Sequence, residues 1–421
     1  MHNVHCQDFY GYKKETAVKS KILFSKSFKS AFTLKPQFKS LFPWLMVVTE
    51  RRSRVYILRR CTALLILGIV CLTFWRDMTP NNVIVDDQLR DYFNQTGAVY
   101  CDGESFAYRH ISLVNSNNRI QVGRAFDCSN IPYLRRFKLT QDYSIQNVIP
   151  TNGLKDVVFV GAADSNYWTA MRVAFSTVRE HFGKQNKFIL YDLGGVKETY
   201  GTELIHLCNF ELRTFDFNIL PKDVRDLKTF SWKVFILAEM FAEGVDVIYL
   251  DSSLYFTSGQ WNLFFQSMND CFRLTPFQLS GDTGHGLKYA TDKRMYDFIP
   301  LDLNVIREDH MFEANLILMH RSDLTRQLLK WSVLCALTRD CINPTGSFLG
   351  CGGRREQESV CHRQDQSLFN ILVYNMEANL RRYGYQVIAH GAQSHPKNTK
   401  SRHETRRGQY IDAASTSFFT C

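Results

Sequence analysis

The chain has 421 residues, a net charge of +10 and an apolar fraction of 45%. This composition excludes a disordered chain, because enough apolar side chains are present for one large domain or two smaller ones. It also argues against a nucleic-acid-binding body, because residues 1–60 hold 13 basic and 3 acidic side chains and the rest of the chain is balanced.

A basic segment followed by an apolar stretch is typical of a membrane anchor. We predict that residues 1–54 form a basic cytosolic tail and residues 55–76 a transmembrane signal-anchor. Cys61–Trp75 carries no charge, and five arginines precede it. A cleaved signal peptide and a buried core helix are the alternatives; the long preceding segment disfavours the first, and the missing polar stripe the second. The arginines predict a single-pass type II orientation with the C-terminal part in the lumen, and the short span fits the membrane of the Golgi or endoplasmic reticulum.

The residues after the anchor carry features of an oxidising lumen. Nine of the twelve cysteines lie there and predict disulfides, with Cys101 and Cys128 as a candidate pair. Zinc is the alternative, but no C-x-x-C pair occurs. Asn94 begins an N-glycosylation sequon. We expect residues 77–150 to form a lumenal stem or lead-in and residues 397–421 a basic C-terminal tail.

Apolar strands alternate with helices in the region between these segments. Strands are predicted at 156–161, 187–191, 211–217, 245–250 and 313–320, and helices at 169–182, 204–207, 228–243, 324–337 and 366–376. Strands that alternate with helices imply βαβ units. The sequence therefore predicts an α/β domain over residues 151–396, with a mostly parallel central sheet and flanking helices.

Polar residues follow the first and fourth of these strands. Ligands of parallel sheets bind beyond the carboxyl ends of the strands, so we expect Ala162–Asn166 and Asp251–Tyr255 at one mouth. A carboxylate at the position of Asp251 can bind a divalent cation or a ribose hydroxyl. The alternative is a turn or helix-capping role.

Two later segments can complete such a site. Asp365 and Gln366 stand where a helix begins, so Asp365 is either a helix cap or a catalytic carboxylate. His390 is either a metal ligand or a surface histidine. Neither a nucleophile elbow nor an H-E-x-x-H sequence occurs, so hydrolase and metalloprotease functions have no motif support.

Taken in order, these stretches resemble the GT-A glycosyltransferases. Residues 156–167 (DVVFVGAADSNY) are similar to the opening strand and nucleotide loop, and residues 230–256 (FSWKVFILAEMFAEGVDVIYLDSSLYF) to the helix and strand that usually end in Asp-x-Asp. Residues 362–372 (HRQDQSLFNIL) resemble the Asp-Gln-Ser/Ala-x-x-Asn segment of glycosyltransferase family 8 and its relatives. The chain also resembles an uncharacterised membrane-anchored family, expanded in nematodes and described as a domain of unknown function.

The resemblance implies a hexosyltransferase-like enzyme with a nucleotide-sugar donor, a glycan, glycoprotein or glycolipid acceptor, and no nucleic-acid partner. It implies donor binding by Asp251, Ser253, Ala162, Asp164 and Lys233, and a catalytic or sugar-orienting role for Asp365 with Gln366. It also implies Mn²⁺ or Mg²⁺ at Asp251, Ser253 and His390.

Ser253 departs from the family pattern, because it stands where the second aspartate of Asp-x-Asp would bind the metal. Three outcomes stay open: other ligands such as Asp365 or His390 hold the metal, Lys233 or Lys288 supplies the positive charge instead, or catalysis is lost. The alternative function is therefore a catalytically inactive membrane-anchored binding protein. A structural ectodomain held by disulfides is a third hypothesis, which leaves the strand–helix pattern unexplained.

Overall fold

A computed structural model describes residues 99–114, 117–145, 157–256, 276–279, 281–301, 310–351, 359–382 and 399–401. All of these residues belong to one compact unit. The predicted membrane segment, Asn94 and His390 lie outside them. Within the described ranges, no helix is both long enough and apolar enough to cross a bilayer.

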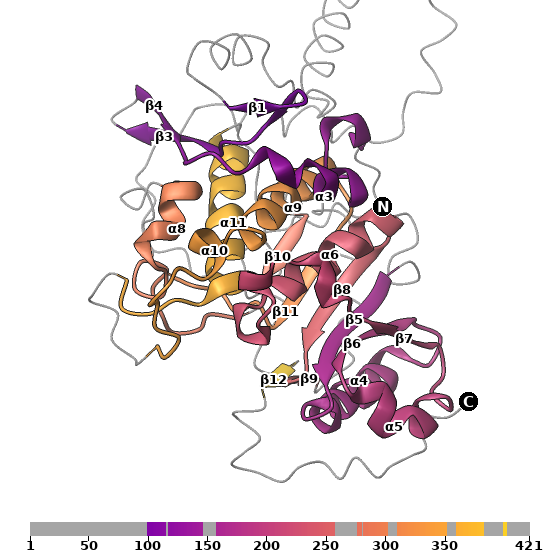
Figure 1. Ribbon diagram of the computed structural model, residues 1–421. Coiled ribbons are helices and arrows are strands. Elements are labelled where there is room, and N and C mark those ends of the chain that lie inside the picture. Colours follow the sequence, from indigo (N-terminus) through magenta and orange to yellow (C-terminus); the bar gives the residue numbers. More distant parts are fainter. Residues whose placement is uncertain are drawn as a thin grey trace, which may run out of the picture. The chain divides into compact units, whose positions relative to one another are not determined.

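A six-stranded sheet forms the centre of this unit, in the order β10-β11-β8-β5-β6-β7 (Figure 1). The strands are β5 (Val157–Asp164), β6 (Phe188–Gly194), β7 (Phe210–Thr214), β8 (Asp246–Asp251), β10 (Phe277–Leu279) and β11 (Leu316–Met319). Strands β7, β6, β5 and β8 are parallel, whereas β11 runs antiparallel to both β8 and β10. The predicted α/β class with a mostly parallel sheet is confirmed.

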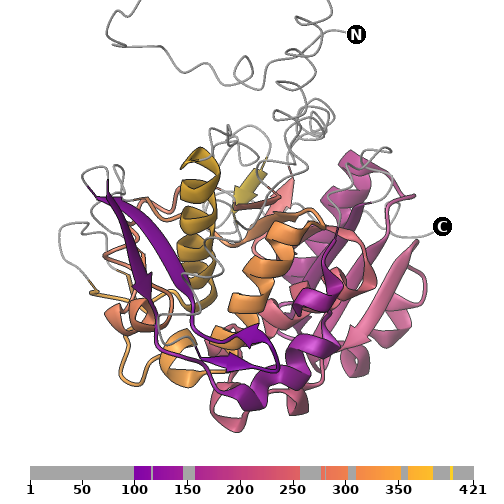
Figure 2. The same cartoon turned by 90° about the horizontal axis from the view of Figure 1, so that it is seen from above.

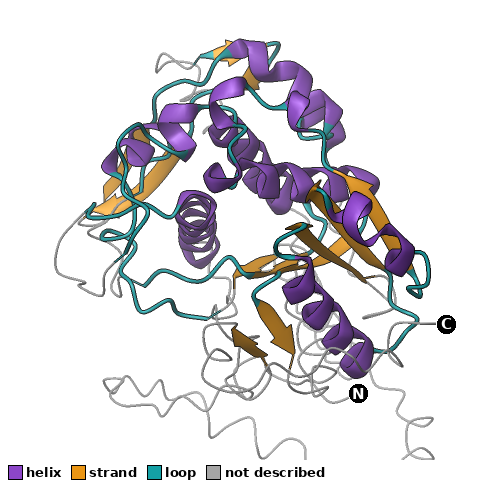
Figure 3. Ribbon diagram, turned by 60° about the horizontal axis from the view of Figure 1, so that its bottom comes forward, coloured by secondary structure: helices purple, strands orange, loops and turns teal. Residues whose placement is uncertain are grey.

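Helices cover both faces of the sheet (Figure 3). One face packs against α4 (Trp168–Phe182) and α5 (Val196–Leu204), and the other against α6 (Ser231–Glu243), α9 (Asp323–Ala336) and α11 (Gln364–Arg382). Phe159 of β5 packs into the α4 cluster, while its neighbours Val158 and Val160 pack into the α6 cluster. Burial on both faces explains the continuous apolar runs in the strands.

The remaining elements are short. They comprise β1 (Tyr100–Cys101), β2 (Glu104–Ser105), β3 (Arg109–Val114), β4 (Asn117–Val122), α3 (Ile131–Arg136), β9 (Leu254–Phe256), α8 (Lys293–Phe298), α10 (Arg339–Ile342) and β12 (Thr399–Ser401). Figure 2 shows the indigo elements β1 to α3 on the side of the molecule that carries α9 and α11. Phe106, Phe126 and Phe137 bury their rings in the same cluster as α6 and α9, so this region contributes to the main core.

One predicted helix is misplaced. The sequence pattern suggested a helix at 204–207, but α5 ends at Leu204 and begins at Val196. Gly194 and Gly195 adopt positive φ angles that stop β6 and turn the chain at once into the helix. The Asp192 carboxylate then accepts hydrogen bonds from the main-chain N–H groups of Val196 and Lys197, which fixes the start of α5.

Disulfides join several of the cysteines, as predicted for the region that follows the predicted anchor. The described pairs are Cys101–Cys128, Cys335–Cys341 and Cys351–Cys361, and Cys208 is also disulfide-bonded. The predicted pairing of Cys101 with Cys128 is thus confirmed.

Candidate active site

The chain reverses its progress across the sheet beside β5. From β5 it adds β6 and then β7 on one side, and it returns to place β8 on the other side of β5. In open α/β sheets, ligands bind outside the carboxyl ends of the strands at such a switch point. Ala162 of β5 and Asp251 of β8 are register partners there, so the two predicted strand ends are direct neighbours.

Asp251 is the last residue of β8. The alternation of side chains along the strand decides on which face of the sheet the Asp251 side chain lies. Val247 and Tyr249 bury their side chains in the cluster formed with α6, α9 and α11. Because side chains two residues apart share one face of a strand, Asp251 points toward these helices. Its main-chain N–H donates to the Asn315 carbonyl at 2.7 Å. The side chain is 30% exposed, so it borders both the core and the mouth of the sheet.

Lys233 joins this strand end to a distant part of the chain. It stands in the first turn of α6 and is only 3% exposed. Its Nζ lies 3.2 Å from Asp251 Oδ1 and 2.7 Å from Asp365 Oδ2. It also donates a hydrogen bond to the Ala314 carbonyl at 3.1 Å. Three residues predicted separately from the sequence therefore form one buried cluster, which we call the Lys233 cluster.

Asp365 reaches the cluster from the first turn of α11 and is 5% exposed. Burial raises the pKa of Asp365, and the charge of Lys233 opposes this rise. Burial alone would lower the pKa of Lys233, but the charges of Asp251 and Asp365 raise it above its usual value. Lys233 therefore stays protonated between the two carboxyl groups.

Tyr249 is a fourth member of the site that the sequence analysis missed. Its hydroxyl donates to Asp251 Oδ1 at 3.0 Å, and Lys233 Nζ lies 5.3 Å from the centre of its ring. Burial raises the pKa of Tyr249 well above the ordinary value, so the hydroxyl keeps its proton. The two-residue spacing between Tyr249 and Asp251 in a predicted strand was the signal that could have identified it. Both donors engage Oδ1, and among the described contacts Asp251 Oδ2 has none.

The other predicted donor-binding residues lie near the switch point but outside the cluster. Asp164 ends β5, and its Oδ1 accepts the main-chain N–H groups of Asn166 and Tyr167, each at 3.0 Å. That carboxylate therefore shapes the turn between β5 and α4. Ala162 is buried in the sheet, and Ser253 is half-buried in the turn between β8 and β9. Gln366 is half-buried, and its buried Nε2 has no hydrogen-bond partner.

The described residues do not fit a resident metal ion held between the two carboxylates. Lys233 lies against both Asp251 and Asp365, so a divalent cation shared by them would stand beside an ammonium group. In the described part of the chain, no three His, Cys, Asp or Glu side chains gather as metal ligands do. The metal set of Asp251, Ser253 and His390 stays a prediction, because His390 lies outside those ranges.

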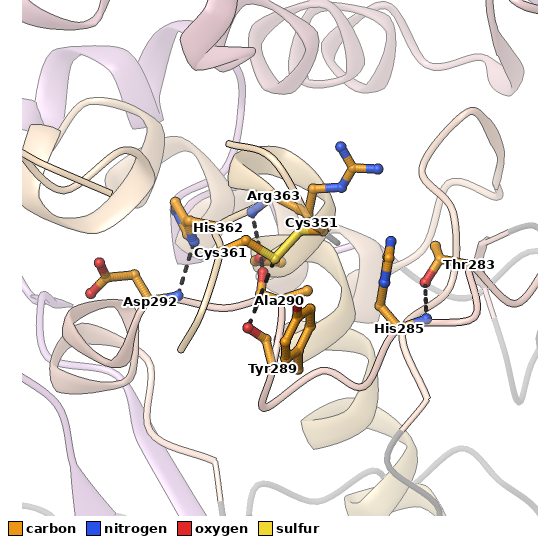
Figure 4. The surroundings of a disulfide bond; sticks show 10 residues. Thr283, His285, Tyr289, Ala290, Asp292, Cys351, Cys361, His362 and Arg363 are labelled. Carbon is orange, nitrogen blue, oxygen red and sulfur yellow. Dashed lines mark hydrogen bonds between the residues drawn. A yellow bond between two sulfur atoms is a disulfide. The ribbon is translucent and has the colours of Figure 1, made fainter. Parts of the chain in front are cut away.

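The segment before α11 is held by buried polar contacts (Figure 4). His362 is fully buried; its Nδ1 accepts the N–H of Asp292 at 3.1 Å, and its Nε2 lies 2.9 Å from the Ile342 carbonyl. Ser367 donates to the Ala290 carbonyl at 2.9 Å. Burial lowers the pKa of His362 to about 4, so the ring is neutral. These contacts fix the start of α11 and with it Asp365.

Asn370, which lies within α11, pairs its side-chain amide with the main chain of Phe312. Its Oδ1 accepts the N–H of Phe312, and its Nδ2 donates to the carbonyl of the same residue, both at 2.8 Å. Asn370 thereby mimics a neighbouring strand for the chain just before β11. It connects α11 to the segment that carries Ala314, whose carbonyl accepts from Lys233.

Comparisons with known proteins give a family match and several distant structures. Residues 101–238 match a family described as "Protein of unknown function (DUF1647)". The match ends inside α6, so it includes Lys233 but neither aspartate of the cluster. The predicted resemblance to a domain of unknown function is confirmed to this extent. No curated protein sequence matches the chain.

The solved structures that the chain resembles include glycosyltransferases. The galactosyltransferase LgtC, in complex with donor and acceptor sugar analogs, has a TM-score of 0.31 and 17% identity, over 51% of this chain and 70% of LgtC. The mannosyltransferase Ktr4p from S. cerevisiae has a TM-score of 0.29 and 11% identity, over 50% and 72%. Core-mannan synthase A from Aspergillus fumigatus, in a Mn/GDP form, has a TM-score of 0.28 and 8% identity, over 54% and 79%. This likeness is loose, and the function has to be derived from this chain's own residues.

Proposed function

We propose that this chain is a glycosyltransferase that moves a sugar from a nucleotide-sugar donor to a glycan, glycoprotein or glycolipid acceptor. The observation that carries the proposal is the Lys233 cluster at the switch point of the sheet. A buried ammonium group holds Asp251 and Asp365 in place, and carboxylate oxygens are strong acceptors for the hydroxyl groups of a sugar. Asp251 Oδ2, which none of the described groups engages, is the oxygen best placed to receive such a hydroxyl.

The cluster suits the binding of the sugar better than the binding of phosphate. In the transfer, the acceptor hydroxyl forms a bond to the anomeric carbon, and the bond from that carbon to the diphosphate breaks, so that the diphosphate leaves with the electron pair. The hydroxyl proton passes to a base. Asp365 is buried and paired with Lys233, which favours a sugar-orienting role over that of the base. Asp251 and Asp365 would fix the donor sugar, and Lys233 would keep both carboxylates oriented.

The proposal also covers the protein family and the cellular location. Kinship with glycosyltransferase family 8 and with a nematode-expanded family rests on the motifs around Asp251 and Asp365. The type II orientation in the Golgi or endoplasmic reticulum rests on the arginines before the uncharged stretch Cys61–Trp75 and on the sequon at Asn94. The described disulfides support an oxidising compartment.

A catalytically inactive binding protein on the same fold is the second candidate. Ser253 favours it, because a neutral hydroxyl replaces the carboxylate that would end an Asp-x-Asp motif. Such a protein would bind a nucleotide or a glycan at the Lys233 cluster without turnover.

The test is the release of nucleotide from donors by the full chain. We would incubate it with UDP- and GDP-sugars, each with and without Mn²⁺ and with a mixture of glycan acceptors, and measure free UDP or GDP. One donor should be consumed, and Asp365→Asn should lower the rate by about a hundredfold or more without unfolding the protein. Asp226→Asn is the matched control, since Asp226 caps an exposed turn that asparagine also caps.

The outcomes separate the two candidates. A rate that Asp365→Asn leaves unchanged would remove the Lys233 cluster from the reaction. If the folded wild-type chain binds a nucleotide sugar but consumes none, the inactive binding protein becomes the better account.

A further inference from the structure

The proposed reaction needs a positive charge that the Lys233 cluster does not supply. A nucleoside diphosphate leaves with negative charge, and enzymes stabilise such charge with cations or hydrogen-bond donors. Lys233 is buried, and its Nζ contacts Asp251, Asp365 and the Ala314 carbonyl, so its three donors are already used. A different cationic side chain is therefore needed to bind an anionic group of the ligand.

Arg363 is a cation without an assigned contact. Among the arginines whose side chains the structure describes, each of the others engages a carboxylate, a carbonyl, an aromatic ring or a further group. No described residue offers such a partner to the Arg363 guanidinium, and its Nε is buried without a hydrogen bond. Buried polar atoms in folded proteins nearly always have partners, and the planar donors of arginine suit paired oxygens. An unengaged arginine at this depth therefore points to a ligand.

Arg363 is close in sequence to Asp365 of the Lys233 cluster. It stands two residues before Asp365, and its carbonyl accepts the N–H of Gln366 at 2.8 Å and that of Ser367 at 3.2 Å. It therefore occupies the start of α11. Its own N–H donates to Ser367 Oγ at 3.3 Å. These hydrogen bonds fix the main chain of Arg363, whereas no described group binds its guanidinium.

Figure 4 shows how the side chain of Arg363 lies relative to its neighbours. His362 turns into the protein toward Asp292, whereas Arg363 extends away from His362 and from the Cys351–Cys361 disulfide. The residue as a whole is half-buried, so its stem packs against the protein while part of the side chain remains accessible.

We infer that Arg363 is an oxyanion-binding residue of this site and that it binds a phosphate, carboxylate or sulfate group of the ligand through its guanidinium. The oxyanion belongs either to the diphosphate of the donor or to an acidic acceptor sugar. That choice rests on the proposed function, whereas the binding of an oxyanion by Arg363 does not require turnover.

The experiment measures the binding of simple anions by calorimetry. The full chain is titrated with inorganic pyrophosphate, UDP, GDP and glucuronic acid, at low and at physiological salt. Arg363→Gln removes the charge, and Arg363→Lys keeps it without the planar pair of donors. Arg381→Gln is the matched control, because Arg381 lies on the same helix and is exposed in an ion pair with Glu377.

Arg363→Gln should weaken the binding of at least one probe by about tenfold, as expected for the loss of a charge-assisted hydrogen bond, with Arg363→Lys intermediate and Arg381→Gln unchanged. Weaker binding of pyrophosphate and the nucleotides assigns Arg363 to the donor diphosphate, and weaker binding of glucuronic acid alone assigns it to an acidic acceptor. Equal affinities in wild type and Arg363→Gln, or no binding of any probe by the wild type, would overturn the inference. Failure of the proposed function would show instead as an absence of turnover with intact, Arg363-dependent anion binding.

Discussion

Among the described residues, two lysines are buried beside carboxylates, and they differ in what surrounds them. Lys330 of α9 lies 2.5 Å from Glu104 Oε2 and joins the N-terminal strands to the core. The other oxygen of Glu104 accepts the N–H of Gln141, so the carboxylate is fully engaged. Burial lowers the pKa of Lys330, because one carboxylate offsets only part of the cost.

Lys233 is buried to the same degree but has two carboxylates, and their charges raise its pKa. One of them, Asp251, is partly exposed and has an oxygen that none of the described groups engages. The Lys330 pair is a closed contact that serves stability. In the Lys233 cluster, an oxygen of Asp251 stays without a described partner at the edge of the sheet where ligands of open α/β folds bind, and this difference is why we propose a functional role for the cluster.

The largest expected effect concerns stability at the closed pair. Lys330→Met leaves the Glu104 carboxylate buried without its counter-charge, and we expect the free energy of unfolding to fall by about 3 kcal/mol or more. Urea unfolding followed by tryptophan fluorescence measures it.

A double variant is the control for this effect. Glu104→Gln with Lys330→Met removes both charges and should recover most of the loss, since no unpaired charge stays buried. If Lys330→Met proves as stable as the wild type, the pair does not have the structural role assigned to it here.

His362 is a third buried basic side chain, and unlike the two lysines it has no side-chain contact with a carboxylate among the described residues. His362 bonds only main-chain groups, and burial lowers its pKa from 6.5 to about 4. The unfolded chain therefore takes up a proton at higher pH than the folded chain. The stability that depends on neutral His362 is complete above pH 6.5 and declines as the pH falls toward 4, by about 3 kcal/mol at most.

The measurement compares pH profiles of unfolding. We expect the wild type to lose stability more steeply than His362→Asn between pH 6.5 and 4, because asparagine does not titrate. Parallel profiles for the two proteins would contradict the assignment of a neutral, buried His362.

The smallest predicted effect lies inside the Lys233 cluster. Tyr249→Phe keeps the ring beside Lys233 but removes the hydrogen bond to Asp251 Oδ1. Donor binding should weaken by about fivefold, in keeping with about 1 kcal/mol for one hydrogen bond, and stability should change little. Tyr191→Phe is the matched control, because Tyr191 is buried on the same face of the sheet and its hydroxyl meets Arg213, away from the cluster. Equal weakening by both variants would argue against a specific role for Tyr249.

The sequence predicted the strands and the residues at their ends better than the contacts between them. The apolar runs of β5 and β8 were visible because both faces of these strands are buried, and Asp251 and Asp365 stood out at the boundaries of elements. The meeting of Lys233 with Asp365 was not predictable from spacing, because it depends on how α6 and α11 pack. Periodicity also gave no direction for β11, and the three-residue β10 is too short to show a pattern.

Residues 101–137 also show that sequence patterns do not reveal tertiary contacts. Cys101 and Cys128 were a plausible pair, but the burial of Phe106 and Phe137 beside α6 depends on tertiary packing between distant segments. Short strands without strong alternation give little local signal. The sequence analysis therefore treated this region as a lead-in, and nothing in its local pattern revealed the contribution to the core.

The most direct test of the central claim is the thermal stabilisation of matched variants by nucleotide sugars. A ligand that binds only the folded state raises the unfolding temperature, and at a hundredfold excess over Kd it adds about 2.7 kcal/mol. UDP- and GDP-sugars would be tested on the wild type, on Lys233→Met and on the double variant Glu104→Gln, Lys330→Met. We predict stabilisation of the wild type and the double variant by the same donor, and none of Lys233→Met. Undiminished stabilisation of Lys233→Met would show that the donor binds elsewhere and that the Lys233 cluster, like the Lys330 pair, is a structural contact.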